Sequence, residues 1–249
     1  MSGHSKWATI KHKKGAQDKA RGKLFAKLIR QVEVAAREGG GDINSNSALR
    51  TMFTKARESS VPLDTIERAI KRGTGELEGV RYEAISYEGY GPGGIAVIVE
   101  CLTDNRNRTG ADVRSILSKS GGSMAEPGAV SWQFERKGVV SLDRSFDEDS
   151  LTLAALEAGA EDVQDLGDLW QVVCAPGDLA ALKAGLEEAG FPSSSAEPVM
   201  LAGSNIEIND ETEARKVLKL IDSLEDNDDV QNVYSNFDIP DSILEAASL

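Results

Sequence analysis

The order of helix and strand patterns between residues 139 and 201 constrains the fold more than any other feature of the sequence. Short apolar or alternating runs, which are typical of strands, are separated by longer runs with an apolar stripe at helical spacing. The expected elements are strand 139–142, helix 149–158, strands 163–166 and 169–174, helix 179–189 and strand 196–201. This order of strand, helix, strand, strand, helix and strand is that of the ferredoxin-like arrangement.

A second set of patterns flanks this segment on both sides. Strands are expected at 82–90, 95–101 and 129–135, with a turn at 136–138 and a helix after the Asp104–Thr109 loop. The helix expected at about 211–224 and the strand at 230–237 can complete this set. We therefore expect an α+β protein with two ferredoxin-like domains, in which an acidic domain, 138–201, is inserted into a discontinuous domain, 82–135 and 202–249.

Residues 1–75 predict a separate domain of three helices preceded by an N-terminal arm. The first helix runs from about residue 16 to 37 and ends before three glycines at 39–41. Leu49 and its partners at helical spacing predict a second helix, and Pro62 opens a third that ends near Gly73. The residue pattern changes from helical to strand-like after residue 81, and residues 74–81 are expected to form a linker.

Charge is strongly segregated along the chain, whose net charge is -13. Residues 1–75 hold 16 Lys and Arg against 7 Asp and Glu, net +9, whereas residues 76–249 hold 12 against 34, net -22. Concentrated positive charge attracts polyanions, and an acidic remainder is repelled by them. The sequence therefore predicts that the N-terminal part meets a nucleic acid.

The first thirty residues carry most of this positive charge, nine Lys and Arg against Asp18. On a helical projection, Lys19, Lys23, Lys27 and Arg30 fall on one face, opposite the apolar stripe, as phosphate contact requires. The alternative interpretation is a merely solvated face. The candidate nucleic-acid-binding residues are Lys6, Trp7, Lys11, Lys13, Lys14, Lys19, Arg21, Lys23, Lys27 and Arg30.

A second candidate anion site follows the apolar run at 95–101. Asn105, Arg106, Asn107 and Arg108 stand between this strand and a predicted helix, where arginines beside a helix N-terminus can hold a phosphate. The alternative is a structural cluster that pins the loop to its own domain. The residues alone leave both interpretations open.

The sequence offers no evident catalytic or metal site. His4 and His12 are the only histidines, and both lie in the arm. No Cys and His cluster has metal-ligand spacing, and no phosphate-binding loop with the required lysine is present. We therefore predict a non-enzymatic protein without a cofactor. Cys101 and Cys174 are expected to be buried and reduced, and no apolar run is long enough to span a bilayer, which favours a cytoplasmic protein without a membrane partner.

Several motifs together resemble the YebC/PmpR family over nearly the whole chain. They are Gly3-His4-Ser5-Lys6-Trp7, Arg21-Gly22-Lys23-Leu24-Phe25, Ile66-Glu67-Arg68-Ala69-Ile70-Lys71, the segment 87–94 (YEGYGPGG) and the segment 103–109 (TDNRNRT). The resemblance implies a helical N-terminal domain, two ferredoxin-like domains with one inserted in the other, and a non-enzymatic cytoplasmic regulator. The segment 61–64, Val-Pro-Leu-Asp, departs from the Met-Pro-Lys-Asp that is commoner in the family and lacks one positive charge.

The family is commonly assigned as DNA-binding transcriptional regulators. Its mitochondrial relatives resemble translational activators, and some bacterial members resemble ribosome-associated factors that relieve stalling. We therefore expect a nucleic-acid-binding regulator of gene expression, with DNA and transcription first. The alternative is a translation factor that binds rRNA or mRNA on the ribosome. The sequence carries no prediction of the oligomeric state.

Overall fold

The computed structural model describes residues 17–247, without the side chains of residues 17–21 and 245. Its N-terminal part consists of three helices, α2 (Gln17–Gly39), α3 (Ser47–Glu58) and α4 (Leu63–Thr74). Leu28 and Val32 of α2 pack with Leu49 of α3 and Ile66 of α4 in a buried apolar cluster. The predicted three-helix part is confirmed, and the apolar stripe of α2 forms its core.

Two buried polar side chains fix how these helices meet. Asn46 caps α3, because its Oδ1 accepts from the backbone N–H of Leu49 at 3.0 Å while its Nδ2 donates to the carbonyl of Ala35 at 2.8 Å. The Glu33 carboxylate of α2 is 2% exposed and accepts from Arg72 Nε of α4 at 2.8 Å. The helices are therefore joined to each other by polar as well as apolar contacts.

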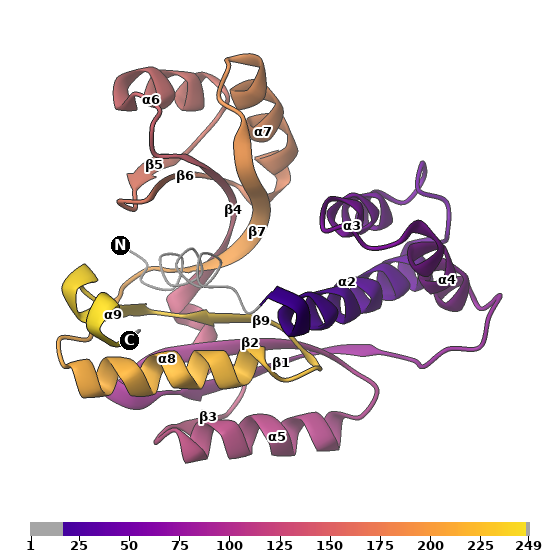
Figure 1. Cartoon of the computed structure of the whole chain (residues 1–249), viewed down its shortest axis with the longest axis horizontal. Helices are drawn as coiled ribbons and strands as arrows, with labels where there is room; N and C mark the ends of the chain where they lie inside the picture. Colours follow the sequence, from indigo (N-terminus) through magenta and orange to yellow (C-terminus); the bar gives the residue numbers. More distant parts are fainter. Residues whose placement is uncertain (1–16, 248–249) are drawn as a thin grey trace.

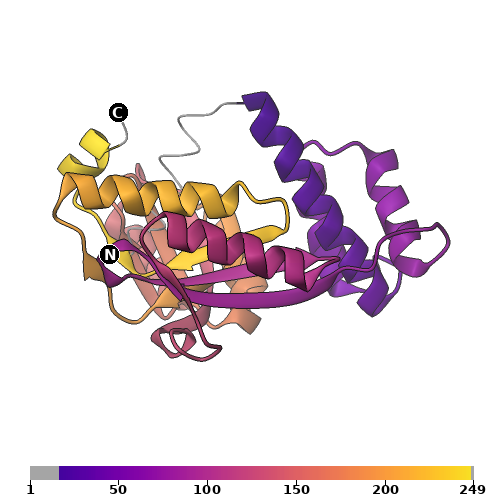
Figure 2. The same ribbon diagram turned by 90° about the horizontal axis from the view of Figure 1, so that it is seen from below.

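The first sheet joins segments that are far apart in the sequence. Its strands are β1 (Glu83–Tyr90), β2 (Ala96–Thr103), β3 (Ser123–Ala125) and β9 (Val230–Ser235), and a short helix, η1 (Pro92–Gly94), separates β1 from β2. The spatial order is β3-β1-β2-β9, with antiparallel neighbours throughout. Helices α5 (Arg106–Lys119) and α8 (Glu211–Glu225) cover one face of this sheet (Figure 2). The pairing of β9 with β2 thus returns the chain to the sheet that begins at residue 83.

The second sheet lies entirely between β3 and α8 in the chain. Its strands are β4 (Phe134–Asp143), β5 (Asp162–Asp165), β6 (Leu169–Cys174) and β7 (Ser193–Ala202), and its helices are α6 (Glu148–Glu157) and α7 (Leu179–Glu188). Two short helices, η2 (Ser131–Gln133) and η3 (Pro176–Asp178), precede β4 and α7. The spatial order is β5-β6-β4-β7 with antiparallel neighbours. This is the ferredoxin-like arrangement that the sequence predicted.

The predicted turn at 136–138 is wrong. Strand β4 begins at Phe134 and continues through this segment, where Gly138 lies opposite both Cys174 and Pro198. A Cβ atom at Gly138 would stand 2.7 Å from Cys174 Sγ. The glycine therefore permits close approach to the neighbouring strand and does not form a turn. Of the strand expected at 129–135, residues 129–133 form a loop and η2, and only residues 134 and 135 belong to a strand, β4.

The C-terminal part contains elements that the sequence did not predict. Strands β8 (Ile206–Glu207) and β10 (Phe237–Asp238) form a parallel pair, and helix α9 (Asp241–Ala247) follows. The predicted strand 230–237 is interrupted at Asn236, which is buried. Its Oδ1 accepts from the Ala96 N–H at 2.7 Å, so a side chain replaces the backbone partner that a continuous strand would have supplied.

Apolar contacts join the two sheets to each other, but polar contacts join the three helices to the sheets. Ile98 and Tyr234, on the face of the first sheet opposite α5 and α8, pack with Phe134 and with Met200 of β7. The apolar cluster of the three helices contains, among the described residues, only members between 25 and 70. Figure 1 shows the three helices beside one end of the first sheet, linked to it by the segment before β1. In this arrangement the basic face of α2 makes polar contacts with the sheet-containing part of the chain.

Candidate nucleic-acid interface

Two lysines of the basic face of α2 contact the acidic segment, defined here as residues 225–229, from the last residue of α8 to the residue before β9 (Glu-Asp-Asn-Asp-Asp). Lys23 Nζ lies 2.6 Å from Asp226 Oδ1 and donates to the Asp226 carbonyl at 2.9 Å. Lys27 Nζ donates to the carbonyl of Glu225 at 2.8 Å. The face that was expected to bind phosphate is therefore occupied by acceptors from the same chain.

The end of α8 explains why these lysines dock there. The last carbonyls of a helix have no partner within the helix, and they form the negative end of its dipole. Glu225 is the last residue of α8 and Asp226 is its C-cap. The two ammonium groups thus satisfy carbonyls at the end of α8, and the carboxylate of Asp226 adds to the attraction.

Arg30 makes the deepest contact between α2 and the acidic segment. Its Nη1 donates to the Asp228 carbonyl and to Asp229 Oδ1, the latter at 3.0 Å. The guanidinium carbon also lies 5.3 Å from the centre of the Tyr82 ring, in cation–π geometry. The side chain of Arg30 is 19% exposed, so this pair is better shielded from solvent than that of Lys23.

Asp229 is a buried carboxylate shared by three elements. Its Oδ1 accepts from Arg30 of α2, and its Oδ2 accepts from Arg108 Nη2 at 2.8 Å and from Thr109 Oγ1 at 2.7 Å, both in α5. Burial by itself raises the pKa of the Asp229 carboxyl, but the hydrogen bonds from Arg108 and Thr109 and the two positive charges outweigh burial and lower the pKa. Asp229 is therefore ionised at neutral pH and fixes α5 and α2 to the start of β9.

The geometry around Asn105 matches the structural interpretation of this segment. The Asn105 side chain caps α5 by accepting from the Arg108 N–H at 3.1 Å. Arg108 Nη2 lies 2.6 Å from Asp104 Oδ1 as well as bonding Asp229, and these hydrogen bonds raise the pKa of its guanidinium. By contrast, Arg106 has a 61% exposed side chain whose Nε is 3.9 Å from Glu83, and Asn107 is exposed.

We expect Arg108→Ala to lower the melting temperature clearly and Arg106→Ala to leave it nearly unchanged. The first change leaves the buried Asp229 carboxylate without one of its donors, whereas the second removes a solvated side chain. Thermal unfolding followed by circular dichroism measures both. Equal melting temperatures for the two variants would contradict the structural interpretation and favour the interpretation of this segment as an anion-binding site.

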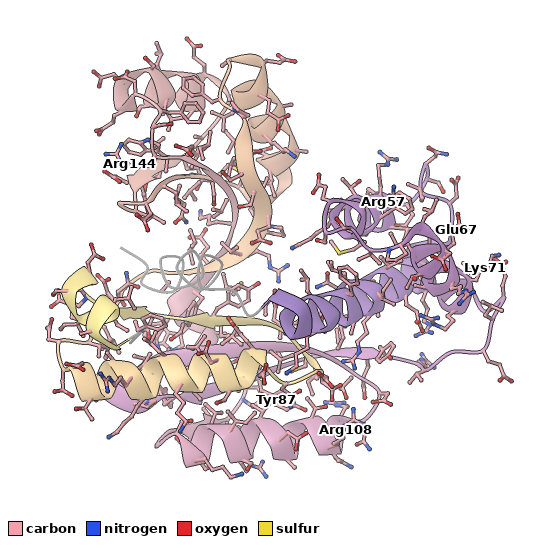
Figure 3. The ribbon with its side chains drawn as sticks, viewed as in Figure 1. Arg57, Glu67, Lys71, Tyr87, Arg108 and Arg144 are labelled. Atoms are coloured by element: carbon pink, nitrogen blue, oxygen red, sulfur yellow. The ribbon has the colours of Figure 1, made fainter. Side chains whose placement is uncertain are left out.

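A polar cleft of about 360 Å³ lies where α2, α5 and the acidic segment meet. The residues that line it are Arg30, Tyr82, Asp104, Arg108, Asp112, Asn227, Asp228 and Asp229. Figure 3 shows Arg108 at the end of α5 nearest the three helices. Both arginines of the lining are bonded to carboxylates, and the described residues contain no cluster of His, Cys, Asp or Glu arranged to hold a metal ion. The cleft is therefore the polar junction between the basic and acidic parts of the chain.

Comparison with known protein families assigns the chain. The model described as "TACO1/YebC protein N-terminal domain" matches residues 5–76, and the model described as "TACO1/YebC second and third domain" matches residues 82–237. The chain belongs to the TACO1/YebC family. The resemblance found in the sequence motifs is thereby confirmed.

Curated relatives of this TACO1/YebC chain and one solved structure agree with the assignment. Proteins named "probable transcriptional regulatory protein" from Halothermothrix orenii and Thermobifida fusca are 56% and 55% identical, and each alignment covers 98% of both chains. The crystal structure of a conserved hypothetical protein from Aquifex aeolicus is 46% identical, with a TM-score of 0.83, over 91% of this chain and 94% of that one. The predicted fold is thus confirmed.

The predicted binding residues of this family member fall into two groups, those that contact the acidic segment and those whose side chains the structure does not describe. Lys23, Lys27 and Arg30 contact the acidic segment. Lys19 and Arg21 belong to α2, but their side chains lie outside the described residues. The arm residues Lys6, Trp7, Lys11, Lys13 and Lys14 also lie outside them.

Three cations that sequence reasoning did not single out lie on the outer helices. Arg57 of α3 and Arg68 and Lys71 of α4 are exposed, and no acidic side chain among the described residues pairs with them. Figure 3 shows Lys71 on the side of the helices away from the sheets and Arg57 on α3. Residues 31–75 hold 7 Lys and Arg against 6 Asp and Glu, so the net charge of this segment did not indicate a basic surface. The spacing of 68 and 71, which places them on one face of α4, was the available clue.

Proposed function

We propose that this protein regulates gene expression by binding a nucleic acid through its N-terminal part. The observation that carries the proposal is the segregation of charge, net +9 in residues 1–75 and net -22 in residues 76–249, on parts that share no buried apolar cluster among the described residues. Positive charge on a small separate unit attracts phosphates while the acidic remainder orients the protein away from them. The names of the Halothermothrix and Thermobifida relatives support a regulatory role.

Duplex DNA is the first candidate ligand because the relatives are named as transcriptional regulators. The alternative is structured RNA, either mRNA or rRNA on the ribosome. The candidate residues of α2 favour this alternative, because they are lysines and arginines suited to phosphate contact with no Asn or Gln among them to read adenine, and structured RNA is recognised mainly through shape and backbone. Gel-shift titrations of the full chain with duplex DNA and with an RNA hairpin of equal charge distinguish the two.

We expect replacement of Lys11, Lys13 and Lys14 with Gln to weaken binding to either ligand. Each lost phosphate contact reduces counterion release, so the slope of log affinity against log salt becomes shallower by about 2 to 3 units if all three lysines contact phosphate. Titrations at several salt concentrations measure this slope.

Lys119, Lys216 and Lys219 provide a matched control for the arm variant. All three are exposed lysines of the acidic part, and their replacement with Gln changes the net charge by the same amount. We expect this control to keep the salt slope of the unmodified protein. A slope reduced equally in both variants would show that general charge, and not the N-terminal part, governs binding.

A further inference from the structure

We propose that Lys23, Lys27 and Arg30 form a phosphate-binding site that the acidic segment occupies, so that this segment and a nucleic acid compete for the same cations. The inference rests on the proposed function and adds its regulation. In the described structure the site is closed, and binding of a nucleic acid requires α2 to leave residues 225–229.

The acidic segment presents acceptors in the manner of a phosphate backbone. A carboxylate and a carbonyl of Asp226 hold Lys23 at 2.6 and 2.9 Å, the carbonyl of Glu225 holds Lys27 at 2.8 Å, and Asp229 holds Arg30 at 3.0 Å. Charged donors form their strongest hydrogen bonds with anionic oxygens, and phosphates supply the same kind of acceptor. The three cations therefore lie along a row of oxygens that a nucleic-acid strand can replace.

The contact has the properties of a reversible one. It is made by ion pairs, by hydrogen bonds and by the stacking of Arg30 on Tyr82, and the buried apolar cluster of the three helices has no described member outside residues 25–70. The side chains of Lys23 and Asp226 are 26% and 67% exposed, and a further pair, Lys55 with Glu197, links α3 to β7 at 46% and 49% exposure. Exposed ion pairs contribute little to stability and are screened by salt.

The connection between the two parts permits such a separation. Residues 74–81, which join α4 to β1, are all exposed. Arg37 Nη2 of α2 donates to the Val80 carbonyl at 3.2 Å, so the segment up to residue 80 is attached to the helices. Rotation near residues 81 and 82 therefore moves the helices as a unit and releases Arg30 from both Tyr82 and Asp229.

Charge makes the closed arrangement and nucleic-acid binding mutually exclusive at this face. Asp226 and Asp228 are exposed beside the three cations, so phosphates that approach the closed face meet carboxylates first. Like charges at close range repel. The alternative is a permanent contact in which the lysines serve only to cap α8, and nucleic acid binds elsewhere on residues 1–75.

A crosslink across the contact separates these possibilities in the full-length protein. Lys23→Cys combined with Asp226→Cys places two thiols where an ion pair stood, at side chains that are 26% and 67% exposed, and a short bifunctional maleimide joins them. Cys101 and Cys174 are buried, and burial raises the pKa of the Cys101 thiol to about 12, so the native cysteines do not react. The control is the same variant treated with a monofunctional maleimide, and its melting temperature checks that the fold is kept.

We expect the crosslinked protein to bind duplex DNA and the RNA hairpin about ten- to a hundredfold more weakly at low salt than the control, because the contacts of Lys27 and Arg30 are withheld. Equal affinities of the crosslinked and control forms would overturn the competition and leave the proposed function intact. Failure of every form, including the unmodified protein, to bind either probe would overturn the proposed function and this inference together.

Discussion

Asp229→Asn lowers the free energy of unfolding by about 2 to 4 kcal/mol. The change removes the negative charge of a buried cluster and leaves the positive charges of Arg30 and Arg108 in place. The carboxylate accepts from Arg30, Arg108 and Thr109, and an amide can replace only some of these bonds while adding donors that face other donors. Urea unfolding at neutral pH measures the loss.

Asp228→Asn is the matched control for this variant. It makes the same chemical change one residue earlier, at an exposed side chain that contributes only its carbonyl to Arg30. We expect its stability to stay close to that of the unmodified protein. A similar loss in both variants would show that net charge of the acidic segment, and not the bonds of Asp229, is responsible.

The effect of Asp229→Asn should also depend on pH. The pKa of Asp229 is lower in the folded protein than its ordinary value, so the folded state binds this proton less readily than the unfolded state. The stabilisation is therefore fully present above a pH of about 4 and is lost as pH falls through the lowered folded value. The stability difference between the unmodified protein and the Asp229→Asn variant should shrink over that acidic range, and acid titrations of both forms measure it.

Replacement of Lys19, Lys23 and Lys27 with Gln should reduce nucleic-acid affinity at low salt by one to two orders of magnitude and make the salt slope shallower by about 2 to 3 units. Arg30 is left unchanged because it bonds the buried Asp229. Stability should change little, since partly exposed lysine contacts contribute little to folding. Gel-shift titrations over a range of salt concentrations and urea unfolding measure the two quantities.

The Gln variant of Lys119, Lys216 and Lys219 again serves as the control, with no expected change in slope. If the α2 variant keeps both its slope and its affinity, Lys23 and Lys27 only cap α8. Binding is then carried by the arm or by the outer cations such as Arg57 and Lys71. A loss of stability without a change of slope would point to the same conclusion.

The sequence by itself determined most of the longer elements and the ferredoxin-like order of the segment from β4 to β7. The helical period in segment 211–224 reflects burial of one face of α8, and the nearly continuous apolar run in segment 169–174 reflects burial of almost every residue of β6. Both patterns are local properties of the sequence. The turn predicted at Arg136-Lys137-Gly138 is absent, because the reason for a glycine at position 138 is the Cys174 Sγ atom on a neighbouring strand. The break at Asn236 depends likewise on Ala96, 140 residues away.

The sequence also determined that α2 carries a basic face opposite an apolar one, because both faces follow from helical spacing within a single element. Only the tertiary structure decided what that face contacts. Lys23, Lys27 and Arg30 meet residues about 200 positions away, and no local pattern connects them. The segregated charges that predicted an external polyanion also attract each other within one molecule, since electrostatic attraction depends on distance in space and not on position along the chain.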